Sequence, residues 1–288
     1  MRNPERYYQE SGAINGIGVI TLLGIGLVAA AVLGAVYGYA TYYIPLIYLN
    51  FFICLFFGIG VGKAVGKASI WGKVRNSKAM MGISLIIGLA AWYFAWVFWL
   101  NAFSEHESFM WNPAEIYSMT SLFAMLGIYE IFGWTPTGVA LYVIWAIEAV
   151  IIIGGTFLSA LGAMGRQPFC EESGDWTQES IVSSRLEPVV NPQDMITRLE
   201  SHDMGPVTDL KLVDHNDRVR TKVTLYASKD SSMGSKYLTV DQVVVSYDDE
   251  GKAEENETAI VENLILNSGD YATLQEWRKT LSATTPAG

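Results

Sequence analysis

Four long apolar stretches constrain the fold of this chain more than any other feature. A helix needs about 20 apolar residues to cross the hydrocarbon core of a bilayer. Four stretches meet or approach that length, and a fifth is shorter and contains Glu130: Ile17–Tyr39, Ile44–Gly62, Ala79–Phe103 and Val139–Met164, then Ile116–Phe132. The sequence therefore predicts an all-α membrane domain over residues 1–166, with four transmembrane helices.

The distribution of basic residues predicts how these helices are oriented. The loop after the second stretch contains no acidic residue and five basic ones: Lys63, Lys67, Lys73, Arg75 and Lys78. Short loops rich in Lys and Arg stay in the cytoplasm, and their side chains can contact anionic lipid headgroups. The segment SEHESFMWNPAEIY after the third stretch has three glutamates and no Lys or Arg. We therefore expect it on the opposite side.

The short stretch Ile116–Phe132 is predicted not to span. If it did, Arg166 and the chain after it would lie outside, against the charge pattern. We expect a re-entrant or interfacial helix here, with both ends of the chain in the cytoplasm of a bacterial inner (plasma) membrane. The first apolar stretch is longer than the segment of about 7–15 residues in a cleavable signal peptide, so we expect a retained signal anchor.

The stretch FGIGVGKAVGKASIWGK, residues 57–73, has five glycines and three lysines and could suggest a phosphate-binding loop. The motif G-x-x-x-x-G-K-[ST] is absent, because Phe57 and Val61 stand where its first glycine is needed and alanine follows both Lys63 and Lys67. Small residues instead recur every four positions in the first two helices: Gly26, Ala30, Gly34 and Gly38, then Gly58, Gly62 and Gly66. Such spacing lets helix backbones approach closely. We expect these residues to pack the first two helices as a hairpin and to support oligomers.

Glu148 lies about ten residues into the fourth apolar stretch, near the predicted midplane of the membrane. A carboxyl at that depth is costly unless it is paired, hydrated or protonated. Two interpretations stay open: a proton-relay or cation site, or a neutral carboxyl that hydrogen-bonds within or between subunits. Asn50 and Tyr93 are the expected neutral partners, and Glu130 is expected to be an interfacial carboxylate.

Aromatic residues follow one face of the third predicted helix, at Trp92, Trp96, Trp99 and Phe103. Such a stripe can form a hydrophobic ligand pocket or a cation cage. It can also form the aromatic belt at the membrane interface. The belt is the favoured interpretation, because this end of the helix is predicted to lie at the interface.

The segment QPFCEESGDW follows the fourth apolar stretch. It resembles a juxtamembrane segment of bacterial multi-span membrane proteins of unknown function, in which Pro-Phe-Cys-Glu is followed by a second cysteine and a tryptophan. The resemblance implies a C-x-x-C pair, which could bind zinc or act in redox chemistry. Here Ser173 replaces the second cysteine. We therefore expect no metal and no cofactor, and interpret Cys170 as a buried or juxtamembrane thiol, with acylation as an alternative.

The rest of the chain is predicted to be a linker, residues 167–190, followed by a small acidic α+β domain, residues 191–288. From residue 167 onward there are eleven basic and twenty-two acidic residues, a net charge of −11. The predicted elements are a helix capped by Asn191, an antiparallel sheet and a last helix capped by Asp270, with strands at Val207–Val213, Val219–Ala227, Tyr237–Tyr247 and Thr258–Leu266. An acidic domain repels nucleic acid, so protein partners are expected.

These features predict a non-enzymatic membrane protein that presents an acidic cytosolic domain to a protein partner, as part of a homo-oligomer or membrane complex. The alternative is a proton- or cation-handling transporter or channel subunit that uses Glu148. A membrane-embedded enzyme is disfavoured, because the sequence has no recognisable nucleophile motif, metal cluster or carboxylate pair.

Overall fold

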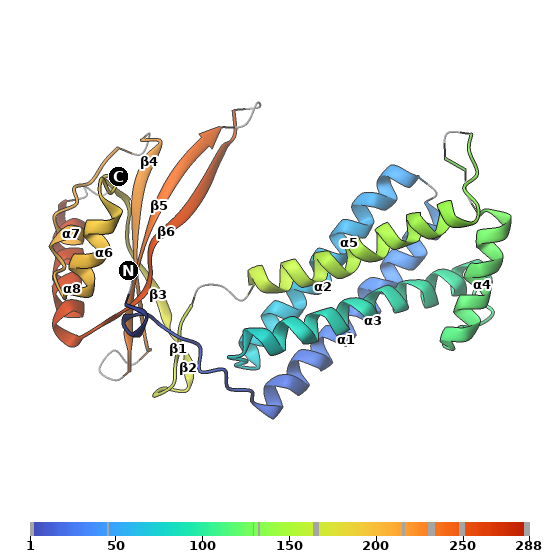
Figure 1. Cartoon of the computed structure of the whole chain (residues 1–288), viewed down its shortest axis with the longest axis horizontal. Coiled ribbons are helices and arrows are strands. Elements are labelled where there is room, and N and C mark those ends of the chain that lie inside the picture. The colour runs from blue at the N-terminus through green and yellow to red at the C-terminus, as the bar shows by residue number, and fades with distance from the viewer. Residues whose placement is uncertain are drawn as a thin grey trace. The chain divides into compact units, whose positions relative to one another are not determined.

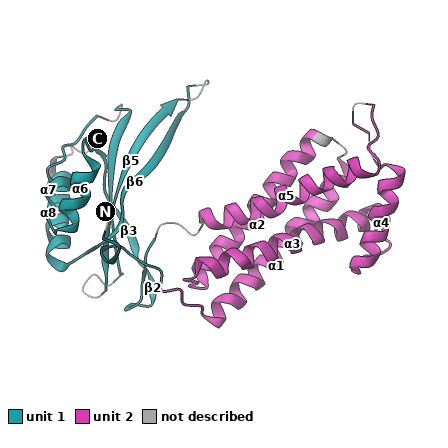
Figure 2. Cartoon of the chain, in the orientation of Figure 1, with its two compact units in different colours: residues 1–10, 166–288 teal, residues 11–165 magenta. Residues whose placement is uncertain are grey.

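The structure, a computed structural model, forms two compact units (Figure 2). It describes residues 3–44, 46–128, 130–131, 133–163, 167–214, 217–229, 234–247 and 251–284. The helical unit comprises Ser11–Gly165, and the sheet unit comprises Met1–Glu10 together with Arg166–Gly288. Arg166, used to predict orientation, and Phe132, the predicted end of the fifth stretch, lie outside the described residues.

Among its described residues, the helical unit contains four helices that are long and apolar enough to cross a membrane, as the sequence predicts. They are α1 (Gly16–Tyr43), α2 (Ile47–Trp71), α3 (Ser77–Phe103) and α5 (Val139–Ala163). Helix α2 extends beyond its predicted end at Gly62, so Lys63 and Lys67 lie within the helix instead of in a loop. The shorter α4 (Pro113–Leu126) lies across the end of the unit at which α3 ends and α5 begins (Figure 1).

Asparagine residues set the start of three of these helices. The side-chain oxygens of Asn15, Asn76 and Asn112 accept hydrogen bonds from backbone N–H groups of α1, α3 and α4, at 3.1, 2.8 and 3.0 Å. The first N–H groups of a helix have no intrahelical partner, and an asparagine cap satisfies one of them. The caps therefore fix where the chain turns from loop into helix.

The small residues of α1 and α2 do pack against helices, but most of them face a helix other than the predicted partner. A Cβ atom at Gly38 would lie 2.8 Å from the backbone nitrogen of Trp99 in α3, and one at Gly62 would lie 2.4 Å from the carbonyl oxygen of Thr156 in α5. Gly34 likewise faces α3 and Gly58 faces α5, whereas Gly26 faces both Ile87 of α3 and, at 3.3 Å, Val65 of α2. Neighbours in sequence therefore need not make the closest approach: α1 packs tightly on α3, and α2 on α5.

The sheet unit has a four-stranded antiparallel sheet, which confirms the predicted helix-plus-sheet character of this part. Its order is β3 (Gln178–Leu186), β4 (Val219–Ala227), β5 (Lys236–Tyr247) and β6 (Ala253–Leu266). Helices α6 (Pro192–Glu200), α7 (Gly205–Thr208) and α8 (Ser268–Thr284) lie on one side of the sheet (Figure 1). Leu225, Leu238 and Leu264 from the strands and Leu199 and Leu274 from the helices are completely or almost completely buried between them.

Three details of this unit differ from the prediction. The predicted strand Val207–Val213 contains part of α7, which begins at Gly205-Pro206, and meets the sheet through one bridge to β3. Strand β3, and a hairpin of β1 (Phe169–Cys170) and β2 (Asp175–Trp176), fall in the range assigned to the linker. Asp270 lies inside the first turn of α8, since Asn267 accepts the hydrogen bond from its backbone nitrogen at 2.7 Å.

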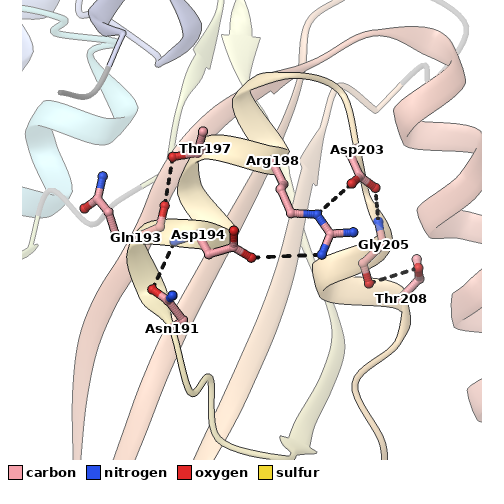
Figure 3. A network of polar contacts seen from close by, with 8 residues as sticks. All are labelled: Asn191, Gln193, Asp194, Thr197, Arg198, Asp203, Gly205 and Thr208. Carbon is pink, nitrogen blue, oxygen red and sulfur yellow. Dashed lines mark hydrogen bonds and ion pairs between the residues drawn. The ribbon is translucent and has the colours of Figure 1, made fainter.

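A polar network joins the ends of α6 and α7 (Figure 3). Asn191 caps α6 as predicted, accepting a hydrogen bond from the backbone nitrogen of Asp194 at 3.2 Å. The Nε of Arg198 donates to Asp203 at 2.7 Å, and Asp203 also accepts from the backbone nitrogen of Gly205 at 2.9 Å. The hydrogen bond from Arg198, and then that from Gly205, lower the pKa of the Asp203 carboxyl.

Residues 3–10, which we call the N-terminal segment, complete the sheet unit. Tyr7 forms an antiparallel bridge with Leu264, and the backbone nitrogen of Tyr8 donates to the carbonyl of Asn263 at 2.9 Å. The Tyr7 hydroxyl donates to Glu200 at 2.9 Å. This segment therefore pairs with the edge strand β6, a contact between parts of the chain that are far apart in sequence.

Candidate functional site: an aromatic cavity beside Glu148

The helical unit encloses a cavity of about 580 Å³. Its walls come from the C-terminal halves of α1 and α3, the N-terminal halves of α2 and α5, and the end of α4 with the residues that follow it. Cavities of about 300–1,000 Å³ are the usual size for small-molecule ligands. The cavity is therefore large enough for an organic ligand.

Glu148 lines the cavity from α5 and is partly exposed. The hydroxyl of Tyr37 in α1, which is 5% exposed and stacks on Phe57, donates a hydrogen bond to its Oε1 atom. The thiol of Cys54 in α2 donates to the backbone carbonyl of Glu148 at 3.6 Å. Helix α1 thus contacts the carboxyl of Glu148, and α2 contacts its backbone.

Neither Asn50 nor Tyr93, the neutral partners considered from the sequence, hydrogen-bonds to Glu148 among the described residues. The hydroxyl of Tyr93 donates instead to the backbone carbonyl of Trp111. The Oδ1 atom of Asn50 is buried and has no hydrogen-bond partner among the described residues. Both Asn50 and Trp92, whose Nε1 atom is also buried without a partner, line the cavity. Buried polar atoms are nearly always hydrogen-bonded in folded proteins, so two such atoms at one cavity need an explanation.

Aromatic side chains form most of the remaining wall. Trp96 packs edge-to-face on Trp145 with ring centroids 5.1 Å apart, and Trp99 contacts Phe103 and Phe123 at 5.7 and 5.6 Å. All four aromatic residues of the α3 stripe line the cavity. The structure therefore favours the pocket interpretation of that stripe, which the sequence analysis placed second to an interfacial belt.

The cavity is acidic. Glu130, an exposed residue after α4, lines it together with Glu148. Among the described residues that line it, none is Lys or Arg. Lys63 and Lys67 are exposed in α2, and Lys78 is exposed in the first turn of α3. The other predicted headgroup contacts, Lys73 and Arg75, lie between α2 and α3. The basic residues are thus separate from the cavity.

Cys170 is a buried thiol in β1, 1% exposed. Burial acts to raise the pKa of this thiol, but hydrogen bonds from the side chain and backbone of Ser173, and from the backbones of Ser235 and Glu172, outweigh burial and lower it. Within the described parts of the chain, no cluster of three or more His, Cys, Asp or Glu side chains could hold a metal ion. The cavity is therefore the strongest candidate site.

The sequence singled out Glu148 but did not identify Tyr37 as its partner. The two residues are 111 positions apart on α1 and α5. Only the packing of the helices brings them together, so no local sequence signal could have paired them.

The cavity combines a carboxyl group, aromatic ring faces and unpartnered polar atoms, an arrangement that can hold a proton or pair with a cation. Comparison of the sequence with protein-family models, and of the chain with curated proteins and solved structures, found no match.

Proposed function

We propose that the chain is an integral membrane protein whose transmembrane domain binds a cation, or exchanges it for a proton, at Glu148. One observation supports this proposal above all: Glu148 borders a cavity instead of lying in a closed packing interface. That observation favours the transport hypothesis over a purely structural carboxyl.

The chemistry of the cavity explains why the ligand carries positive charge. A carboxyl group away from bulk water is stable as a neutral acid or as a carboxylate paired with a cation. Tyr37 occupies Oε1, and no protein cation lines the described cavity. An arriving cation can therefore displace the proton of Glu148 to solvent without changing the net charge of the site. Aromatic faces around it add cation–π attraction.

The N-terminal segment supports the proposed topology. Residues 3–10 pack in the same compact unit as the chain from residue 167 onward. A folded unit lies on one side of a bilayer, so the chain between must cross an even number of times. Four spanning helices with an interfacial α4 satisfy this condition. The basic residues of the α2–α3 region then place the sheet unit in the cytoplasm, in our proposal that of a bacterial inner membrane.

The acidic sheet unit is proposed to meet cytosolic proteins. Its net charge of −10 favours partners with basic or neutral surfaces. This negative charge includes Glu254, Glu255 and Glu257 in β6. Of these, Glu255 pairs with Arg220 and Glu257 pairs with Lys222. Partner binding that weakens as salt is added would be the signature of such a contact, and binding insensitive to salt would contradict it.

Proton and cation movement in liposomes tests the function at Glu148. The full chain is reconstituted with an internal pH-sensitive dye, and gradients of potassium, sodium or an arylalkyl ammonium ion are applied. We expect wild type to move protons against at least one of these cations. Glu148→Gln keeps the shape and most hydrogen bonds, so it should assemble normally and abolish this movement.

Two further variants control this experiment. Glu130→Gln removes the exposed carboxyl at the cavity and should retain at least half of the activity. Glu148→Leu should be inactive and also less stable by about 1–3 kcal/mol, since the Tyr37 hydroxyl loses its partner. Equal activity of wild type and Glu148→Gln, or no activity of wild type with any of the cations, would reject the proposal for the chain acting alone.

A further inference from the structure

We propose that the ligand of the cavity is an organic ammonium ion that has N–H groups, an apolar body and a separate hydrogen-bond acceptor. This inference deepens the proposed function and rests on it. In the complex, the ammonium group pairs with Glu148 and donates an N–H to Oδ1 of Asn50. The Nε1–H of Trp92 donates to the acceptor on the ligand.

The positions of Asn50 and Trp92 carry this assignment. Asn50 lies one helical turn before Cys54 in α2, and the Cys54 thiol contacts the backbone of Glu148 at 3.6 Å. Trp92 lies one turn before Trp96 in α3, and Trp96 packs on Trp145, one turn before Glu148 in α5. Both residues therefore line the same cavity as Glu148, from neighbouring helices.

The unpartnered atoms of these two residues define what the ligand must offer. Oδ1 of Asn50 is an acceptor and requires a donor, whereas Nε1–H of Trp92 is a donor and requires an acceptor. A buried polar atom left without a partner is unfavourable, so a ligand that satisfies both atoms gains affinity from each. Both atoms are covered by protein in the structure, so rotation about side-chain bonds must turn each of them toward a bound molecule.

The residues that line the cavity favour an organic cation over an inorganic one as the ligand. Hard inorganic cations bind about six to eight oxygen atoms. The described wall is largely aromatic and aliphatic, and nine of its residues are aromatic: Tyr37, Tyr42, Phe51, Trp92, Trp96, Trp99, Phe103, Phe123 and Trp145. Such a wall suits the apolar body of an organic ion, and the aromatic faces attract its charge.

Binding measurements on the full-length protein in nanodiscs test the inference with four probes. Tyramine has an ammonium group, an aromatic body and a hydroxyl. Its N,N,N-trimethyl derivative lacks N–H donors, phenethylammonium lacks the hydroxyl, and 4-ethylphenol lacks the charge. Calorimetric titration gives the affinity for each probe. The same titration of Glu148→Leu serves as the background for partitioning of the probe into the lipid. We expect wild type to bind tyramine at least tenfold more tightly than each of the other three.

Two variants separate the proposed contacts. Asn50→Leu should weaken tyramine binding about tenfold or more and leave the trimethyl derivative unchanged. Trp92→Phe keeps an aromatic ring, so it should weaken tyramine about tenfold and leave phenethylammonium unchanged. Trp111→Phe, outside the cavity lining, is the matched control and should bind all four probes as wild type does. Unchanged binding of the trimethyl derivative by Asn50→Leu, and of phenethylammonium by Trp92→Phe, shows that each variant is folded.

The outcomes separate this inference from the proposed function. Equal wild-type affinity for tyramine and its trimethyl derivative, or wild-type tyramine binding by both Asn50→Leu and Trp92→Phe, would overturn the assignment of an N–H-bearing ligand. Either result would leave a cation site at Glu148 intact. If no charged probe binds wild type more tightly than Glu148→Leu, both the inference and the proposed function fail.

Discussion

The helical unit and the sheet unit present opposite kinds of surface. On the helical unit, Ile20, Val139 and Leu158 are 73, 78 and 67% exposed, and many other large apolar side chains are exposed along the same helices. The sheet unit instead exposes acids such as Glu254 and Glu257 at its surface. The two units are therefore suited to different surroundings. In the helical unit, a carboxyl group inside the fold is exceptional and points to function.

Two carboxyl groups show this difference directly. Asp270 in the sheet unit is 6% exposed and lies 2.7 Å from the Nδ1 atom of His202, a side chain of the same unit. Glu148 in the helical unit has a neutral hydroxyl as its hydrogen-bond partner among the described residues. A carboxyl that lines a cavity and lacks a basic partner among the described residues is prepared to take its positive charge from a ligand or its proton from water.

The largest expected effect concerns the side of the membrane on which each part of the chain lies. A reporter that is active only in the periplasm should be fully active when fused after Glu107 and inactive when fused after Gly288. The reason is that four crossings return the chain to its starting side. The enzyme activity of the reporter in intact cells, measured for each fusion, shows on which side of the membrane the fusion point lies. Activity at both positions would show that Ile116–Phe132 spans the membrane and would break the proposed division between the units.

The second prediction tests whether close backbone contact holds the helical unit together. Gly62→Leu should destabilise it by about 3 kcal/mol or more, because a Cβ there would lie 2.4 Å from a backbone oxygen of α5 and 3.0 Å from a backbone nitrogen. Thermal unfolding in detergent measures the loss. Gly24→Leu in α1 is the control, since its Cβ meets nothing within 4 Å, and it should be nearly neutral. Equal stability of the two variants would contradict the α2–α5 contact.

The smallest expected effect concerns an ionic contact of the sheet unit. The hydrogen bond from Arg198 lowers the pKa of Asp203 from its ordinary value of 3.8. A carboxyl with a lowered folded-state pKa stabilises the fold at pH above its unfolded-state pKa and loses that contribution as the pH falls through the folded-state pKa. Wild type should therefore be slightly more stable than Asp203→Asn at pH 7, with the difference vanishing below pH 3.8.

Denaturant unfolding at several pH values measures this contribution. Both side chains are solvent-exposed, so the difference should be small and should shrink as salt is added. Thr197→Ala, a change elsewhere in the same network, should show no such dependence on pH. A wild-type advantage that grows as the pH falls would contradict the assignment.

The long elements could be predicted from the sequence, because each has its signal within a few consecutive residues. The four apolar helices and the strands β4 to β6 are examples. Strand β3 was missed since it is a polar edge strand, and the segment Val207–Val213 was misjudged because Gly205-Pro206 starts a helical turn. The cavity could not be predicted, because its walls depend on which helices pack together.

The contact between the N-terminal segment and β6 has a consequence for how the protein is made. Tyr8 leaves the ribosome before its partner Asn263, which is translated 255 residues later. Domains generally fold as units during synthesis, so the sheet unit can be completed only once β6 has been translated, after the apolar helices have emerged. Until then the N-terminal segment lacks its native partner. A ribosome that stalls before β6 would therefore leave the helices synthesised with an unfinished domain attached.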